Sequence, residues 1–457
     1  MVKNIAAVLT FLLVPFSVTL SQNNQWSLED CINYAMENNI TIKQSELNTQ
    51  YSQNVLDQSR NSRLPNLNAS SNYSYSFGRA LDQTTYEFTD NQKINSISVN
   101  VSSGVNLFNG FQKRNTIEQN RINLLSAYED VKKIKNDISL NIAAAYLQIL
   151  FSEELLAVTE SQVEITRQQV DRTRKLVEAG KLAKGSSLEI QAQLAAEELN
   201  MVNSENQLLL SYLNLQQILD LQYDPEFKIN DPDIPEPGKK LLIMGVSDVY
   251  QTAEQIMPQI KKSEYNLEST GKELDIAKGM QYPSLSLSGN YNSGFSDIRE
   301  KVIGTDPIMD IPIMGKYPFF EQINDNLSVG VGFGLNIPIF NGNQANTAIA
   351  NARISIENAQ LELQKRKNEL YRDIQTAYTD AVAALKKFES TETALISMEE
   401  SFNYTEKKFE VGLVNTVDYN TSKNQLMVTQ SDLLQAKYDF IFKTRILNFY
   451  MGEPIIF

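Results

Sequence analysis

The sequence contains an internal duplication, and this repeat constrains the fold more than any other feature. The letters LFNG at 107–110 recur as IFNG at 339–342, an offset of 232 positions, whereas residues upstream of the motif match at an offset of 218. The second copy therefore carries a longer insert before the motif. Matched residues include Asp30 with Asp248, Pro65 with Pro283, Ala145 with Ala377 and Gly180 with Gly412. We expect two similar repeats, 22–221 and 246–457, joined by a proline-rich connector at 222–245.

Apolar residues recur at every seventh position after the motif in both copies. This stripe consists of Ile117, Leu124, Val131, Ile138 and Ala145 in the first copy, and of Ile349, Ile356, Leu363, Leu370 and Ala377 in the second. A strict seven-residue step indicates helices that pack in a left-handed, coiled-coil manner. No proline interrupts 111–180 or 343–412. Each stretch therefore predicts a helix about 100 Å long. Shorter helices are expected at 186–221 and 416–450, so each repeat ends in a helical hairpin.

Between the proline and the motif, the period of the pattern changes from helical to two. Strands are expected at 68–78, 95–108, 284–295 and 327–340. In the last of these, Val331 and Phe333 alternate with Gly330, Gly332 and Gly334. One face is apolar, and the other consists of Ser, Asn and Gly without charge. This alternation is typical of outer-membrane barrel strands. A soluble antiparallel sheet can alternate in the same way, but an uncharged polar face favours the lumen of a barrel.

Four strands are too few to form a barrel by themselves, because about eight are needed for closure. Open strand edges are not tolerated in lipid. If the strands lie in a membrane, several chains must therefore share one barrel, with eight strands from a dimer or twelve from a trimer.

The duplicated motif marks the change from strand to helix. The turn residues are Phe108, Asn109 and Gly110 in the first copy, and Phe340, Asn341 and Gly342 in the second. Asn-Gly suits a tight turn, and the aromatic ring suits a membrane interface. Pro65 and Pro283 mark the opposite change, from helix into strand, because a proline disfavours helix at the residue before it.

Composition excludes several classes of function. The net charge of −14 argues against a nucleic-acid partner, and the absence of histidine removes histidine-based catalysis and metal ligation. The single cysteine, Cys31, cannot form an internal disulfide and is expected within a helix. We interpret residues 1–21 as a cleaved signal peptide and expect no later membrane-spanning helix. The sequence shows no nucleophile paired with a base, no phosphate-binding loop and no metal-ligand spacing, so we predict no enzymatic activity, metal or cofactor. The carboxylates of the long helices are expected on solvated faces and not in acid–base pairs.

With its motifs in this order, the chain resembles the TolC family of outer-membrane efflux proteins. The resemblance rests on the duplication, on RLPNL and YPSL before the strands, on LFNG and IFNG after them, and on FEVGLVNTVD at 409–418. It implies an α+β membrane protein that forms a homotrimer, with a twelve-stranded barrel in outer-membrane lipid. Long helical hairpins would form a periplasmic tunnel, and the connector would lie near its equator.

The resemblance also implies a function and a set of partners. The trimer would be the passive exit duct of a tripartite efflux or type I secretion system, supplied by an inner-membrane transporter through a periplasmic adaptor. The candidates for adaptor contact at the hairpin tips are Gly180, Leu182, Gly412 and Val414. The candidates for a periplasmic constriction are Asp418, Ser186 and Glu189.

Asp418 falls on a position that contributes to an acidic ring in relatives, where three copies would attract cations. It is equally well explained as an ordinary carboxylate at a helix N-terminus. Ser186 stands where relatives often carry Asp, and Val414 stands where some carry a basic residue that ties the entrance shut. A charged latch like theirs is therefore not expected.

Two other classes of protein stay open at this point. A structural or adhesive envelope protein with a coiled-coil stalk would explain the heptads but not the two-faced strands. An inner-membrane-linked adaptor would need a lipoyl-like or barrel-hairpin module, which the sequence does not indicate.

Overall fold

The computed structural model describes residues 25–81, 88–232 and 245–455. The expected signal peptide and much of the connector lie outside these residues. The helices are α1 (Leu28–Asn38), α2 (Ile40–Asn61), α3 (Gln112–Glu178), α4 (Lys184–Ile218), α5 (Val246–Ile256), α6 (Pro258–Gly279), α7 (Phe319–Asp325), α8 (Gln344–Glu410) and α9 (Thr416–Tyr450). The strands are β1 (Gln25–Trp26), β2 (Asn66–Leu81), β3 (Phe88–Asn109), β4 (Lys228–Ile229), β5 (Ser284–Ser296), β6 (Glu300–Thr305), β7 (Pro312–Lys316) and β8 (Ser328–Asn336).

The helices of the two repeats match in length, as the duplication in the sequence predicts. Helices α3 and α8 have 67 residues each, and α4 and α9 have 35 each. Helices α1 and α5 have 11 residues each, and α2 and α6 have 22 each. In each of these four pairs of helices, both ends differ by one of the two sequence offsets, 218 or 232. The long helices begin and end within a few residues of the expected positions.

The seven-residue stripe forms the interior of the helical packing. Leu124, Val131, Ile138 and Ala145 are buried in α3, and Ile349, Leu370 and Ala377 are buried in α8. The remaining members of the two stripes, Ile117, Ile356 and Leu363, are half-buried. The same period continues along α3 with buried hydroxyl residues at Ser152, Thr159, Thr166 and Thr173. Two of these hydroxyls donate to their own helix, Ser152 to the Gln148 carbonyl and Thr159 to the Leu156 carbonyl.

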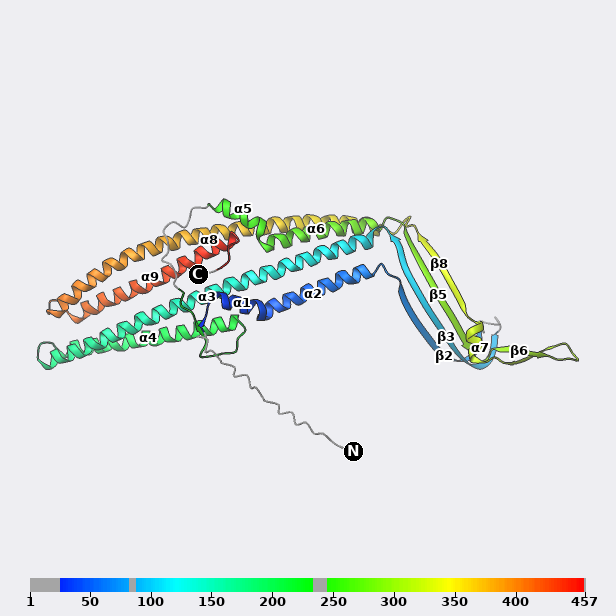
Figure 1. Ribbon diagram of the computed structural model, residues 1–457, viewed down its shortest axis with the longest axis horizontal. Helices are drawn as coiled ribbons and strands as arrows, with labels where there is room; N and C mark the ends of the chain where they lie inside the picture. Colours follow the sequence, from blue (N-terminus) through cyan, green and yellow to red (C-terminus); the bar gives the residue numbers. More distant parts are fainter. Residues whose placement is uncertain (1–24, 82–87, 233–244, 456–457) are drawn as a thin grey trace, which may run out of the picture. The chain divides into compact units, whose positions relative to one another are not determined.

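Four strands form one antiparallel sheet in the order β2-β3-β5-β8 (Figure 1). Asn66 pairs with Gly104, Ser286 with Asn106, and Ser288 with Gly332. The central pair, β3–β5, joins the two repeats. On β8, the apolar face predicted from the alternation is exposed at Val329, Val331, Phe333 and Leu335.

The last strand ends earlier than the sequence predicts. We expected it to continue to residue 340, but β8 ends at Asn336. Pro338 lies just beyond this end, and a proline cannot donate a hydrogen bond to a neighbouring strand. Phe340, Asn341 and Gly342 therefore lie in a segment outside the strand.

The longer insert of the second repeat forms a small substructure beside the sheet. It contains the β6–β7 hairpin and the short helix α7. Gln322 of α7 is fully buried and fixes this helix to β5, because its amide bonds both the N–H and the carbonyl of Ser296. Asn326 adds a hydrogen bond to the Gly294 carbonyl at 2.6 Å.

The compact units of the chain differ from the sequence repeats. One unit takes in residues up to Ile40, Lys135–Val249 and Gln375 onward, and the other takes in Thr41–Ile134 and Tyr250–Ile374. Each repeat contributes to both units, because α3 and α8 continue from one into the other.

Helix α3 includes one unusually apolar stretch. Helix α3 contains an 18-residue window that is apolar enough to cross a membrane by length and composition, and half of that window is buried. The interior of the first unit accounts for such a composition, since Ile142, Tyr146 and Leu150 of α3 are all buried there.

The N-terminal segment and the start of the connector close this interior. Strand β1 pairs in parallel with β4, and Trp26 packs against Tyr34 and Phe227. Tyr146 donates its hydroxyl to the Asn230 carbonyl at 2.5 Å. Cys31 lies in α1, as expected, and burial raises the pKa of its thiol to about 12.

Replacement of Gly110 by alanine tests the first strand-to-helix turn. Gly110 is buried with a φ of +62°, and an added Cβ would lie 2.2 Å from the Gly279 carbonyl oxygen. Gly110→Ala should therefore cost more than the roughly 1–2 kcal/mol of left-handed strain alone. Gly180→Ala is the matched control, because Gly180 has a φ of +72° but open space around it. Thermal denaturation of the purified protein should show the larger loss for Gly110→Ala, and equal losses would contradict the packing.

Candidate functional site

The two strand-to-helix turns have the same backbone conformation. Gly110 and Phe111 have φ values of +62° and +64°, and Gly342 and Asn343 have values of +60° and +66°. Two successive residues in the left-handed region reverse the chain before the helix begins. The Asn109 side chain accepts a hydrogen bond from the Lys113 N–H at 3.3 Å, in the first turn of α3. The duplicated motif thus encodes a specific turn.

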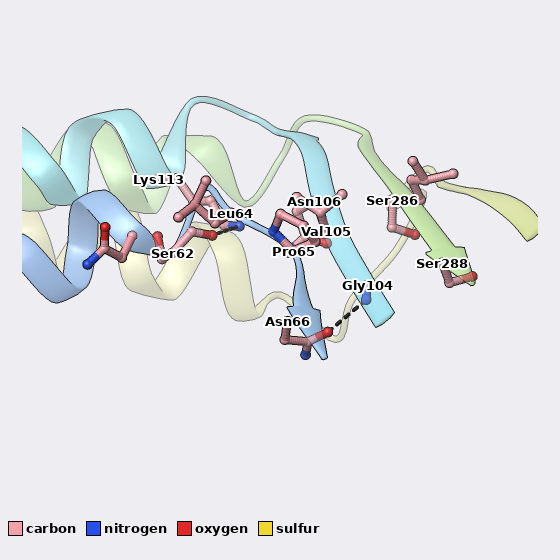
Figure 2. A pocket seen from close by; sticks show the side chains of 12 residues that line it. Ser62, Leu64, Pro65, Asn66, Gly104, Val105, Asn106, Lys113, Ser286 and Ser288 are labelled. Atoms are coloured by element: carbon pink, nitrogen blue, oxygen red, sulfur yellow. Dashed lines mark hydrogen bonds between the residues drawn. The ribbon is translucent and has the colours of Figure 1, made fainter. Parts of the chain in front are cut away.

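A hollow of about 520 Å³, lined by both polar and apolar residues, lies beside the first of these turns. Figure 2 shows its lining, in which the Asn66 side chain accepts a hydrogen bond from the Gly104 N–H at 2.7 Å. Lys113 is the only charged lining residue and donates to the Ser62 carbonyl. Ser286 and Ser288 line it from β5. The small-polar face of the sheet thus meets the start of α3 in an open, nearly uncharged surface.

The tips of the two helical hairpins are built in the same way. The N–H of Lys181 bonds the Leu176 carbonyl at 2.8 Å, and the N–H of Leu413 bonds the Lys408 carbonyl at 2.8 Å. These bonds, with the left-handed φ of Gly180 and Gly412, are the helix-ending pattern that favours glycine. Each long helix thus ends two residues before its glycine, α3 at Glu178 and α8 at Glu410.

The remaining tip residues occupy the first turns of the second helices. Asp418 is exposed in the first turn of α9, where its N–H bonds the Asn415 side chain at 2.8 Å. Ser186 holds the corresponding position in α4, half-buried, and Glu189 is exposed one turn further on. Leu182 and Val414 are half-buried. Sequence reasoning missed two exposed apolar neighbours of Gly412, which are Val411 and Leu413.

The two hairpins contact each other near these tips. Arg172 of α3 pairs with Glu410 of α8 at 2.8 Å, and Gln193 of α4 donates to Asn424 of α9 at 2.8 Å. In the described part of the chain, no cluster of acidic or cysteine side chains could hold a metal ion.

Comparison with known proteins agrees with this geometry. The model of the family described as "Outer membrane efflux protein" matches residues 31–220 and 249–453, which is most of the chain. The chain belongs to the outer membrane efflux protein family. Its function is that of an outer-membrane exit duct in an efflux system, which favours the duct over the stalk and the adaptor considered above.

Individual relatives are distant but similar over most of their length. The chain is 21% identical over 426 residues to the outer membrane protein TolC of Vibrio cholerae, covering 93% of this chain and 90% of that protein. It is 20% identical over 442 residues to TolC of Escherichia coli K12, covering 94% and 84%. The crystal structure of the outer membrane protein VceC of Vibrio cholerae superposes with a TM-score of 0.74 at 16% identity, covering 93% of this chain and 96% of that one. This efflux channel therefore shares their fold.

The efflux channel contains a buried charged cluster between its hairpins. Lys423 of α9 donates to both carboxylate oxygens of Glu197 in α4, at 3.2 and 3.1 Å, and to the Gln162 carbonyl of α3 at 3.1 Å. Thr166 of α3 accepts from Lys423 and donates to Glu197. Both charged side chains are only 3% exposed. Burial lowers the pKa of Lys423, and the attraction of Glu197 opposes this shift. The cluster thus joins three helices.

We expected the carboxylates of the long helices to lie on solvated faces, and for Glu197 this expectation is wrong, because its side chain is buried. Glu197 lies seven residues after the buried Ile190 and seven before the buried Ser204. Its position in the seven-residue period was therefore a signal of burial. Its partner could not be found in this way, because the Lys423–Glu197 contact does not recur between the repeats.

Removal of one member of the pair should be costly. Lys423→Met leaves a buried carboxylate without its cation, which typically costs about 3–5 kcal/mol. The double variant Lys423→Met with Glu197→Leu should recover most of that loss. Arg172→Met is the control, because the Arg172–Glu410 pair is about half exposed and such pairs contribute about 0–1 kcal/mol. Denaturation followed by helical circular dichroism measures all of them, and similar losses for Lys423→Met and Arg172→Met would contradict a structural role for the buried pair.

Proposed function

We propose that three copies of this chain assemble into one duct, with the four strands of each copy contributing to a twelve-stranded barrel in the outer membrane. The observation that carries the proposal is the four-stranded sheet, which has two unpaired edges among the described residues and an exposed apolar face. Strand edges cannot remain unpaired in hydrocarbon. Association of several copies would remove the edges and turn the small-polar face toward a lumen.

We further propose that the hairpin tips receive a periplasmic adaptor, which connects the duct to an inner-membrane transporter. Exposed Val411 and Leu413 flank Gly412 and offer apolar contacts for such a partner. Gly180, Leu182 and Val414 complete the candidate surface. The duct itself conducts passively, and the transporter supplies the energy for export.

The narrowest point of the entrance is proposed at Asp418. Three exposed carboxylates around a threefold axis would attract cations, as charged rings do in other channels. Ser186 and Glu189 are the accompanying candidates on α4. The alternative role of Asp418 is confined to its own helix, where a carboxylate near the N-terminus is stabilised by the helix dipole.

Single-channel recording separates these two roles. The purified protein in a planar bilayer should give a small, cation-selective conductance, and Asp418→Asn should reduce the cation selectivity several-fold. Asp439→Asn is the matched control, because Asp439 is exposed on α9 at the same position of the seven-residue period. It lies about 30 Å along the helix from Asp418.

Each other outcome has a definite meaning. Unchanged selectivity in Asp418→Asn would move the constriction elsewhere and leave Asp418 as a helix N-terminal carboxylate. Equal losses of cation selectivity in Asp418→Asn and Asp439→Asn would indicate a general effect of charge along α9. No conductance from folded, inserted protein would overturn the proposed trimeric duct.

A further inference from the structure

The apolar face of the sheet has a definite height. On β5 it runs from Leu285, beside the strand-to-helix turns, to Phe295 at the far end of the strand. The ten residue steps between them make about 34 Å along the strand. With the tilt of about 40° that is usual in outer-membrane barrels, this becomes about 26 Å, and the apolar band of such barrels is about 25 Å tall. Phe295 therefore marks the outer border of the proposed barrel's apolar band.

Strand β8 does not extend to this border. It begins at Ser328, opposite Asn292 of β5. Residues 293–296 of β5 therefore have no partner strand on this side in the described part of the chain. Unpaired backbone N–H and carbonyl groups are not tolerated at the depth of the hydrocarbon. Another element must satisfy the end of β5.

Helix α7 lies at this place, beside the end of β5 (Figure 1). The amide of Gln322 accepts a hydrogen bond from the Ser296 N–H at 3.0 Å and donates one to the Ser296 carbonyl at 2.9 Å, as a neighbouring strand would. The Asn326 amide donates to the Gly294 carbonyl at 2.6 Å. Helix α7 thus replaces the missing end of β8 at the level of the outer border.

The two sides of α7 differ in polarity. We measure angles around the helix axis from the buried Gln322, at about 100° per residue. The side at about 60–160° is apolar and carries Phe319, Phe320 and Ile323. The side at about 260–300° is acidic and carries Glu321 and Asp325. The helix is short, but it is clearly amphipathic.

The apolar side of α7 faces the same way as the apolar face of the sheet. Phe319 packs on Phe295, with ring centroids 5.1 Å apart, and the Ser293 hydroxyl donates to the Ile323 carbonyl. Phe295 and Ser293 are two positions apart, so both belong to the apolar face of β5. Phe320, on the same side of the helix, is 82% exposed. The apolar surface of the sheet therefore continues onto α7.

The acidic side of α7 is occupied within the chain. Glu321 pairs with Lys301 of the β6–β7 hairpin, and Asp325 accepts a hydrogen bond from the Tyr317 hydroxyl. These contacts fix the base of the hairpin to α7. The insert of the second repeat thus uses the polar half of the helix, while Phe320 on the apolar half stays exposed.

We propose that α7 is an interfacial anchor, with Phe319, Phe320 and Ile323 among the acyl chains of the outer leaflet. This proposal rests on the proposed barrel and adds a lipid contact made by the insert. Lipid is the occupant because the apolar side of α7 continues the lipid-facing surface, through exposed Leu327 and Val329 of the same chain, up to the border of the band. An amphipathic helix with phenylalanine on its apolar face suits this depth. The anchor also holds the base of the β6–β7 hairpin at the membrane.

Tryptophan fluorescence in liposomes tests the anchor. The full-length protein has one tryptophan, Trp26, which lies in the other compact unit and gives the same background in every variant. The test variant is Phe320→Trp. Its matched control is Glu321→Trp, the next residue, which lies on the polar side of the same helix. Val331→Trp reports on the barrel itself, because Val331 is exposed near the middle of the apolar face.

Each variant is reconstituted in phosphatidylcholine that carries bromine either near the headgroup or near the chain ends, because bromine quenches tryptophan only at short range. We expect headgroup-side bromine to quench Phe320→Trp several-fold more than Glu321→Trp. Chain-end bromine should act most on Val331→Trp. Its partner Gly289 lies six residue steps from Phe295, or about 16 Å along the membrane normal, and half of the hydrocarbon is about 15 Å thick.

The other outcomes separate the anchor from the barrel. If Val331→Trp is quenched and Phe320→Trp is not, the anchor is overturned and the barrel stands, whether water or a neighbouring copy surrounds α7. Equal quenching of Phe320→Trp and Glu321→Trp would also overturn the two-sided anchor. Absence of quenching in Val331→Trp would overturn the proposed barrel. Light scattering in detergent must give every variant the wild-type mass, and Ile323→Trp replaces Phe320→Trp if the latter does not assemble.

Discussion

The continuous seven-residue packing stripe is the constraint on which the rest of this structure depends. A single helix of 67 residues has no core of its own, and helices in water draw most of their stability from packing of one face. The stripe keeps that face aligned over the whole length of α3 and α8. Because the period is seven, the stripe stays directed at the neighbouring helices within each compact unit.

The strand-to-helix turns connect this helical packing to a sheet with a different period. Gly110 and Gly342, each followed by a second left-handed residue, reverse the chain within a few positions. The helical stripe begins within two turns of the helix start in both repeats, at Ile117 and at Ile349. A duct needs this junction, since the strands suit lipid and the helices suit water.

The sequence was sufficient for the parts of the fold that are periodic or repeated. The seven-residue period predicted the long helices, and the two-residue alternation predicted the four strands of the main sheet. The offsets of 218 and 232 predicted which residues of the two repeats correspond. The early end of β8 could have been predicted from Pro338. The tip turns followed from Gly180 and Gly412. These features are local, because each is decided by a few neighbouring residues or by one regular period.

The features that could not be predicted depend on contacts between distant segments. The pairing of Lys423 with Glu197 joins two different hairpins and has no counterpart at the repeat offset. Gln322 lies in the insert of the second repeat, so its contact with β5 has no counterpart in the first repeat either. The roles of Asp418, Ser186 and Glu189 depend on the arrangement of several chains, which neither the sequence nor a single chain contains.

The stripe of α3 changes in chemistry from its start to its tip, and this change distributes the packing energy. Leucine, valine and isoleucine occupy it near the sheet, while Ser152, Thr159, Thr166 and Thr173 occupy it toward the tip. Burial of a hydroxyl residue contributes less than burial of leucine, because the stabilisation follows the apolar area removed from water. Apolar packing along this stripe is therefore stronger in the first part of α3, from Leu124 to Ala145, than toward the tip. Toward the tip, Lys423 satisfies its donors only when α3, α4 and α9 keep one register, so the buried ion pair there specifies alignment more than it adds stability.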